Sequence, residues 1–392
     1  METGLEILGE IHNSHLTALR RCKQKFKYAF IDGIQPKLPS LPLARGIWMH
    51  YMLEAQFLKW GIEQGTLLHT PESTNIDGIG QVDIVTNHPE DGPYLVVKYD
   101  DKGNQSEYPL SAAGMLKLLT SQVWSKLLEG EKEKYTEDGH TLPEACDRIL
   151  TEYFYHWKDK PKPKVLLVEW DWQREYKGVT FEGRGDYVIE NNGLLICGDW
   201  KTTKNEPGPN YKFMESQLNL YPWGLAPLLR EYGVSDKKIK AMAVEFDYIA
   251  TKLPTSPSRN KDGSISKRKI NTSRLTLTQF LNSHNLKWDE EQIDEFLRFN
   301  TREFFRRDTF PRNMKVVKEL LEENVEDSYL MASIVENHKK ATRTVSKTCE
   351  WDCDFMAVCM GELYGQNVDY ILKTQYEPRS NSHAGVVEKE DA

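Results

Sequence analysis

The strongest constraint on the fold is a pair of β-branched, apolar segments, 179–190 and 194–201, joined by Asn191-Asn192-Gly193. An Asn-Gly step between two such runs is typical of a β-hairpin. The neighbouring elements expected are strands at 164–172 and 241–250 and a helix at about 212–231. The order strand, strand, strand, helix, strand predicts an α/β core with helical regions before and after it.

This hairpin carries the densest set of reactive side chains. Its first strand contains Gly183-Arg-Gly-Asp186 and its second Asp199-Trp-Lys201-Thr202. Residues two apart on a strand share a face, so Asp199 and Lys201 point the same way, and the turn brings Asp186 beside them. Two close carboxylates repel and favour a cation between them, such as Mg²⁺ or Mn²⁺. Lys201 would then orient water or stabilise charge on a phosphate. An exposed Asp–Lys pair is the alternative interpretation.

Two further pairs are spaced four residues apart. Gln217 and Tyr221 would share one face of the predicted helix, where they could hydrogen-bond a phosphate or the catalytic groups. Gly46 and His50 lie in an apolar helical stretch upstream. An ordinary amphipathic helix and a packed core histidine are the alternatives. Glu169, on the strand before the hairpin, is a further acidic candidate, and an exposed strand residue is its other interpretation.

Taken in order, these motifs resemble the RecB-like, AddB-type exonuclease branch of the PD-(D/E)XK nuclease superfamily. The matching elements are G-x-x-x-H (Gly46, His50), G-x-x-D (Gly183, Asp186), D-x-K-T (Asp199, Lys201, Thr202) and Q-x-x-x-Y (Gln217, Tyr221). The resemblance implies a restriction-endonuclease-like α/β fold with a central mixed sheet flanked by helices. It also implies that His50, Asp186 and Asp199 hold Mg²⁺ or Mn²⁺ together with the peptide carbonyl of Trp200. Lys201 would be the catalytic lysine, assisted by Gln217 and Tyr221.

Four of the six cysteines form a second pattern, with Cys349, Cys353 and Cys359 near the C-terminus and Cys22 far upstream. Four thiolates can hold zinc or an iron–sulfur cluster, and spacing alone does not decide between them. Iron–sulfur members of the RecB-like group place one cysteine before the core and three after it. The resemblance therefore implies a [4Fe-4S] cluster on these four residues, with Zn²⁺ as the alternative. Unrelated buried cysteines are the other interpretation.

Such a cluster would act as a cross-link between the two terminal regions of the chain. Cys22 and Cys349 are 327 residues apart, and closing so long a loop costs about 5 kcal/mol in chain entropy. Metal–thiolate bonds can offset that cost and hold the two terminal regions beside the core.

Charge limits the nucleic-acid interface. The chain has 51 Lys and Arg against 59 Asp and Glu, a net charge of −8, which excludes a generic nucleic-acid coat. Segment 251–274 is different, because it contains seven basic residues and one acidic residue. A locally positive segment is attracted to phosphates, so Lys267, Arg268 and Lys269 are candidate DNA contacts. A solvated flexible loop is the equal alternative.

The expected organisation follows the composition. There is no membrane-length apolar run and no signal peptide, and cysteine is sparse, so we expect the cytoplasm of a bacterium or of a phage-infected host cell. Helices are expected at 276–284, 289–307 and 314–345. The predicted parts are an N-terminal helical region with an inserted hairpin-like segment (1–160), the nuclease core (161–250), a basic flexible loop (251–274), a C-terminal helical region (275–376) and a disordered tail (377–392).

The resemblance implies an Mg²⁺- or Mn²⁺-dependent deoxyribonuclease. We expect an exonuclease that hydrolyses phosphodiester bonds at DNA ends or in single strands, in recombination, repair or phage DNA processing. The alternatives are a catalytically weak or inactive nuclease fold that binds DNA as a scaffold, and a structural zinc protein. DNA is the expected partner and a membrane is not, while a helicase, a recombinase or a second copy of the chain are left open.

Overall fold

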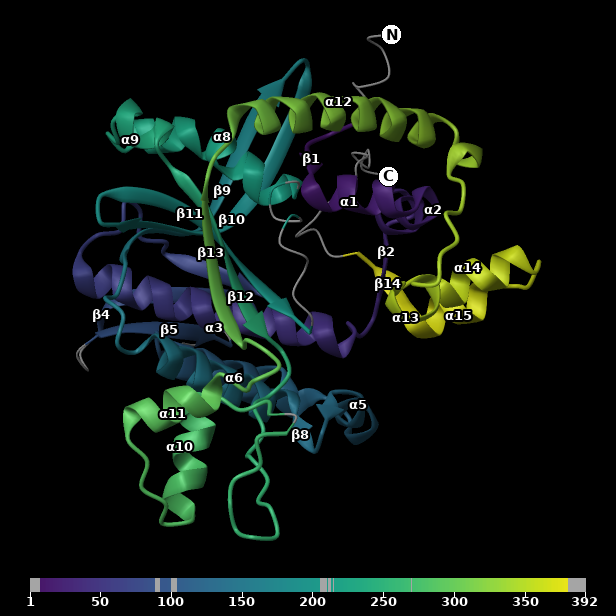
Figure 1. Cartoon of the computed structure of the whole chain (residues 1–392). Helices are drawn as coiled ribbons and strands as arrows, with labels where there is room; N and C mark the ends of the chain where they lie inside the picture. The colour runs from purple at the N-terminus through teal and green to yellow at the C-terminus, as the bar shows by residue number, and fades with distance from the viewer. Residues whose placement is uncertain are drawn as a thin grey trace.

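A computed structural model describes residues 8–88, 92–99, 104–204, 210, 213, 215–268 and 270–379. In these residues a six-stranded mixed sheet lies between two layers of helices (Figure 1). Its strands are β1 (Ile11–His12), β9 (Lys164–Tyr176), β10 (Val179–Asn191), β11 (Leu194–Thr203), β12 (Ala243–Ala250) and β13 (Phe305–Pro311). The predicted α/β core with a central mixed sheet is confirmed.

Strand order follows from the connections. β9, β10 and β11 are successive antiparallel strands, and the β10–β11 turn has positive φ at Asn192 and Gly193, as a tight hairpin turn requires. β12 is parallel to β11 and is reached through helix α8 (Ser216–Glu231), because parallel neighbours need a crossover connection. β13 pairs antiparallel with β12 at the sheet edge, and β1 pairs with the first half of β10.

Each face of the sheet has its own apolar cluster. Alternation along β11 sends Cys197 to one cluster and Ile196 and Trp200 to the other. The first cluster is covered by α8, α1 (Asn13–Arg21) and α12 (Met314–Glu336). The second is covered by α3 (Leu41–Gln64) and α6 (Leu142–Trp157). We call these the α8 face and the α3 face.

The segment expected to be hairpin-like forms a separate four-stranded antiparallel sheet. Its strands are β3 (Ser73–Ile76), β4 (Gly80–His88), β5 (Gly92–Lys98) and β6 (Gln105–Pro109), and helix α4 (Ala112–Gln122) follows and packs on α3. Two short apolar runs in the sequence, at 81–86 and 94–99, correspond to the central strands β4 and β5. The edge strands are mostly polar, so their sequence carries no strand signal.

A second insertion, residues 251–304, separates β12 from β13. It contains a long loop with an antiparallel bridge between Arg259 and Ile265, then α10 (Arg274–Ser283) and α11 (Glu290–Leu297). These two helices pack around a small apolar cluster of their own, and in Figure 1 they lie with the loop beyond the end of β12 and the start of β13.

The C-terminal region returns to the N-terminal one. After α12 come α13 (Cys349–Asp352), α14 (Met356–Leu363), α15 (Asp369–Gln375) and β14 (Tyr376–Pro378). β14 pairs with β2 (Ile34–Pro36), so a strand includes the first residues of the predicted tail, while 380–392 lie outside the described residues. The remaining elements are α2 (Lys23–Phe26), η2 (Lys27–Ile31), η3 (Trp124–Lys126), α5 (Glu129–Lys134), β7 (Thr136–Glu137), β8 (His140–Thr141), α9 (Asp236–Lys240) and η4 (His338–Lys340).

Among the helices described, none has both the length and the apolar character that a membrane span demands.

Candidate active site

Close packing explains the glycines of the motifs. A Cβ atom on Gly183 would lie 2.7 Å from the Trp172 ring, so this position of β10 has no room for a side chain. A Cβ on Gly46 would lie 3.1 Å from the Thr202 hydroxyl oxygen. The first motif, on α3, and the third, at the end of β11, are therefore in direct contact.

Strand β9 changes face at the site. Trp170 packs on the α8 face and Val168 on the α3 face, although residues two apart in a regular strand share a face. Glu169, between them, has a left-handed φ of 46°. A non-glycine residue in this region costs about 1–3 kcal/mol and persists only where its surroundings impose it. The distortion turns the Glu169 carboxylate toward α3, level with Asp186 on β10.

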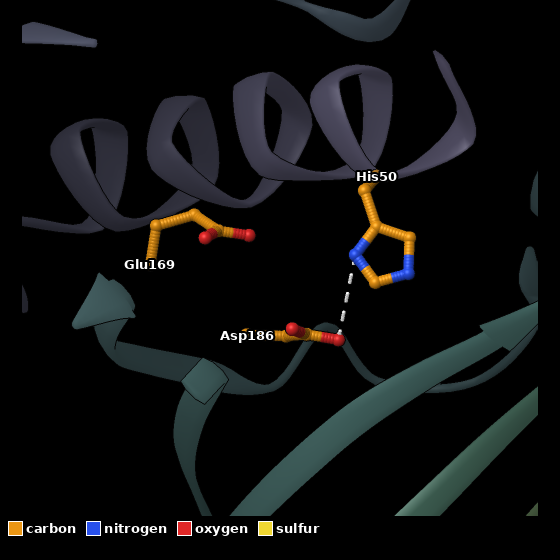
Figure 2. Close-up of side chains that lie close together, drawn as sticks. All are labelled: His50, Glu169 and Asp186. Carbon is orange, nitrogen blue, oxygen red and sulfur yellow. Dashed lines mark ion pairs between the residues drawn. The ribbon is translucent and has the colours of Figure 1, made fainter. Parts of the chain in front are cut away.

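His50, Glu169 and Asp186 converge from α3, β9 and β10 (Figure 2). One ligand atom from each lies within 4.8 Å of the others. The Nδ1 atom of His50 is 3.7 Å from Asp186 Oδ2, and its Nε2 atom is 2.9 Å from the carbonyl oxygen of Trp200. Carboxylate, imidazole and carbonyl oxygen together suit a divalent cation such as Mg²⁺ or Mn²⁺.

Asp199 and Lys201 lie beside this group on β11. Lys201 Nζ is 2.7 Å from Asp199 Oδ2 and donates to Gln217 Oε1 at 3.2 Å. The Gln217 amide donates to the Tyr221 hydroxyl, which donates in turn to Asp199 Oδ1 at 3.5 Å. These four residues, predicted from two separate motifs, form a closed ring of one ion pair and three hydrogen bonds. Asp186 joins the two halves of the site, because its Oδ2 accepts a hydrogen bond from the Trp200 backbone N–H at 2.6 Å.

Burial sets the charge states. It raises the pKa of Asp186 to about 6; the His50 charge opposes this shift and the Asp199 charge adds to it. Burial alone would lower the pKa of Lys201, but the negative charges of Asp199 and Glu215 raise it above its ordinary value. Lys201 is thus a cation at neutral pH. It suits stabilising negative charge rather than accepting a proton.

Sequence reasoning missed one buried acid, Glu54. It lies one helical turn after His50 and its Oε1 accepts a hydrogen bond from the Thr74 hydroxyl at 2.9 Å. Burial raises the pKa of Glu54 to about 7, and burial together with the Glu54 and Asp186 charges raises the pKa of Glu169 well above its usual range. The signal was available, since Glu54 extends the Gly46/His50 spacing by four residues on the same helix face.

Comparison with known proteins agrees with this geometry. The family model described as "PD-(D/E)XK nuclease superfamily" matches residues 13–360, which include every active-site motif. The chain belongs to the PD-(D/E)XK nuclease superfamily. Membership implies a nuclease with DNA as its substrate, in a class that uses Mg²⁺ or Mn²⁺. No curated protein matches the chain.

A solved structure titled "Crystal structure of SSO0001" is similar at 18% sequence identity. The match covers 47% of this chain and 68% of that one, with a TM-score of 0.19. This likeness is too weak to carry an argument.

In this PD-(D/E)XK chain three of the four predicted cysteine ligands, Cys22, Cys349 and Cys359, contact residues 343–346. The backbone N–H of Thr344 points to Cys22 Sγ at 3.4 Å, and its carbonyl oxygen is 3.9 Å from Cys349 Sγ. Arg343 Nε donates to Cys359 Sγ at 3.2 Å. Segments from both ends of the chain thus meet at one short loop.

The fourth cysteine of the set is Cys353. Burial raises the pKa of its thiol, and the neighbouring Cys349 thiol adds to the shift. All six cysteines are among the described residues and none forms a disulfide. Their sulfur atoms form no group of three within 4.8 Å.

The predicted DNA contacts lie in the inserted loop. Lys267 is exposed, with its ammonium 3.7 Å from Glu295 and 4.6 Å from the centre of the Phe299 ring. Arg268 is exposed too. Lys269 lies outside the described residues.

Proposed function

We propose that this protein is an Mg²⁺- or Mn²⁺-dependent deoxyribonuclease that works as an exonuclease on DNA ends or single strands. The observation that carries the proposal is the convergence of His50, Asp186 and the Trp200 carbonyl with the Asp199–Lys201 pair. A structural protein has no need for several buried acids beside one imidazole, because unpaired buried charge is costly.

His50, Asp186 and Asp199 would hold the ion, and Glu169 is a further ligand candidate. The donor set fits such an ion, because His50, Glu169 and Asp186 present ligand atoms within 4.8 Å of one another. Burial makes the negative charge of Asp186 costly, and a cation beside it offsets that cost. When bound, such an ion supplies a polarised phosphate oxygen and a water that deprotonates more readily.

Lys201 would stabilise negative charge that develops on the phosphate. Its hydrogen bond to Gln217 and its pairing with Asp199 fix the position of the ammonium group. Tyr221 holds the Gln217 amide from the other side. Gln217 and Tyr221 therefore act as positioning residues for Lys201 and Asp199.

We also propose that Cys22, Cys349, Cys353 and Cys359 bind a [4Fe-4S] cluster. Cys22, Cys349 and Cys359 contact residues 343–346 and Cys353 interacts with Cys349, which supports a shared site, and backbone N–H donors toward sulfur are suited to thiolate ligands. A single tetrahedral zinc ion with Zn–S bonds of about 2.3 Å needs its sulfurs about 3.8 Å apart. No three of these sulfurs lie within 4.8 Å of one another in the described structure, so the choice of a cluster over zinc rests on the resemblance to iron–sulfur members of the RecB-like group.

The basic loop would contact the DNA backbone through Lys267, Arg268 and Lys269. It leaves the main sheet at the end of β12, where Thr251 N–H donates to the carbonyl of Thr203 at the end of the active-site strand. Phosphate contacts there would align a strand with the active site without reading its sequence.

Digestion of 5′- and 3′-labelled single- and double-stranded DNA, with and without Mn²⁺, tests the function. We expect metal-dependent release of short products from an end, lost in Lys201→Ala and Asp199→Ala proteins whose circular dichroism is unchanged. Binding without cleavage by the wild-type protein would instead indicate an inactive scaffold. Full activity in either variant would contradict the active-site assignment.

A further inference from the structure

Arg184 lies between the two glycines of β10 that precede Asp186. A Cβ atom on Gly183 or on Gly185 would meet an indole ring of the α8 face, so both positions point to that face. Successive residues of a strand point to opposite faces of the sheet. The Arg184 side chain therefore extends on the α3 side of the sheet, on which His50 lies.

Asp171 of β9 lies directly across from Arg184 and holds its guanidinium group. The two residues are register partners, and Arg184 Nε and Nη2 donate to the two carboxylate oxygens of Asp171 at 2.7 Å and 3.0 Å. A guanidinium group has five N–H donors, and this side-on pairing uses two of them. A second acceptor can therefore approach the outer edge of the same group. Phosphate is the acceptor whose geometry arginine matches best, together with carboxylate.

This ion pair is exposed, although it lies next to the buried part of the site. The side chains of Arg184 and Asp171 are 58% and 59% exposed, whereas the side chain of Asp186 is 10% exposed. Two residues along a strand span only about 7 Å. An exposed ion pair contributes little to stability, so a stabilising role does not account for an arginine at this position.

The positive charge of Arg184 acts on the acids of the site. Burial raises the pKa of Glu54 and of Glu169, and the Arg184 charge opposes the rise in both. The guanidinium group is therefore within electrostatic reach of both carboxylates. The site thus combines an acidic interior, in which a divalent ion would bind, with an exposed cation at its edge.

A DNA strand needs both features. Its reacting phosphate would approach the ion, but the acids would repel the phosphates on either side of it, because like charges repel. A cation at the edge of the site offsets that repulsion. Arg184 is placed to do so, since it lies two residues from Asp186 on the same strand.

We propose that Arg184 binds a backbone phosphate next to the scissile one, and that Asp171 holds the guanidinium group in position for this contact. The inference deepens the proposed nuclease function and rests on it for the identity of the substrate. The contact would fix the position of the strand in the site without reading its bases, because phosphates carry no sequence information directly.

The test measures the dissociation constant of a fluorescent single-stranded 20-mer in EDTA at several KCl concentrations. Arg184→Gln should bind about tenfold more weakly, because hydrogen bonds between charged groups are strong. The slope of log Kd against log salt should fall by about 0.7, the value for one phosphate contact on a single strand. Arg184→Lys keeps the charge and should keep the slope.

Arg230→Gln is the matched control. Arg230, on the last turn of α8, forms a similarly exposed ion pair with Asp236 at 2.8 Å, so the variant loses the same charge at a different place. It should keep the wild-type affinity and slope. A loss in Arg230→Gln equal to that in Arg184→Gln would show a general effect of net charge and overturn the contact.

A double variant separates phosphate binding from charge balance. Arg184→Gln/Asp171→Asn removes one positive and one negative charge, so its net charge is that of the wild type. We expect it to bind the strand several-fold more weakly than the wild type, with the reduced salt slope. Wild-type binding by the double variant would mean that Arg184 only balances Asp171 and the neighbouring acids, which would overturn the proposal.

Uncharged linkages locate the phosphate. Methylphosphonates replace the phosphates of the strand one at a time from the labelled end. At the position that Arg184 contacts, the replacement should weaken binding by the wild-type protein and add nothing to the loss in Arg184→Gln, because a shared contact is lost only once. Additive losses at every position contradict the contact.

These binding measurements need no cleavage, so they test Arg184 apart from the nuclease assignment. Wild-type affinity and slope in folded Arg184→Gln would overturn the phosphate contact whatever the cleavage results. Lower stability of Arg184→Gln in urea, with a wild-type salt slope, would make the arginine structural and also overturn it. Arg184-dependent binding by a wild-type protein that cuts no DNA would overturn the nuclease function and support the phosphate contact.

Discussion

At the residue scale, the site is a set of buried carboxyl groups for which protons and a divalent cation compete. The pKa values of Asp186 and Glu54 are raised to about 6 and about 7, and that of Glu169 is raised well above its usual range, mainly through burial. A group whose pKa is raised by folding stabilises the protein while protonated and loses that contribution as pH rises through the folded pKa. Once these carboxyl groups ionise they repel one another, and a bound cation removes that repulsion.

We therefore predict that the metal-free protein loses stability between about pH 4 and pH 7, and that Mn²⁺ restores it increasingly over the same range. Thermal melting at several pH values, with Mn²⁺ or EDTA, checks this. Asp186→Asn should flatten the pH dependence and reduce the Mn²⁺ effect. A Mn²⁺ shift that is the same at pH 5 and pH 7.5 would argue against these ligands.

Some of these residues follow from spacing and others do not. Asp199 and Lys201 were predicted on one face because strand alternation fixes it, and the hairpin turn placed Asp186 next to them. Glu169 takes its place through a face change at a left-handed residue, which no periodic pattern encodes. The sequence named Glu169 as an acidic candidate with an exposed strand residue as the alternative, and only the coordinates bring its carboxylate close to His50 and Asp186.

At the element scale, glycines on β10 let this strand pack against the indole rings of the neighbouring strand β9. A Cβ atom on Gly185 would lie 2.2 Å from the Trp170 ring, which contacts Tyr221 on α8. We predict that Gly185→Ala destabilises the protein by about 1–3 kcal/mol through overpacking. Urea unfolding measures this. Gly130→Ala, at a helical position with open space around it, is the control and should be neutral or slightly stabilising.

The hairpin and the crossover helix were predictable because their turn and periodicity signals are strong. β13 was not, since 289–307 was expected to be helical and α11 ends at Leu297. This edge strand has charged residues at its centre. Arg307 reaches into the sheet to pair with buried Asp247 at 2.9 Å, an arrangement that hydrophobic periodicity cannot reveal.

At the scale of the whole molecule, the two ends of the described chain are joined by the β2–β14 pair, by ion pairs such as Arg20–Asp327, and by the contact of Cys22 with Thr344, which also contacts Cys349. Cys22→Ala should abolish iron binding and lower the free energy of unfolding by about 2–4 kcal/mol, as for other long cross-links. Iron and sulfide content and urea unfolding measure these effects. The Cys146→Ala variant, changed at a cysteine outside the four predicted ligands, should contain as much iron as the wild type. Zinc in place of iron would contradict the cluster, and wild-type iron in Cys22→Ala would contradict the ligand.

The central claim is that the buried acids around His50 hold a divalent ion with which the protein hydrolyses DNA. Its most direct test is the rate at which purified wild-type and Asp186→Asn proteins release nucleotides from end-labelled single-stranded DNA in Mn²⁺. We predict cleavage that EDTA stops, and a loss of about 100-fold or more in the variant with its fold intact. Cleavage by Asp186→Asn at the wild-type rate would contradict the account.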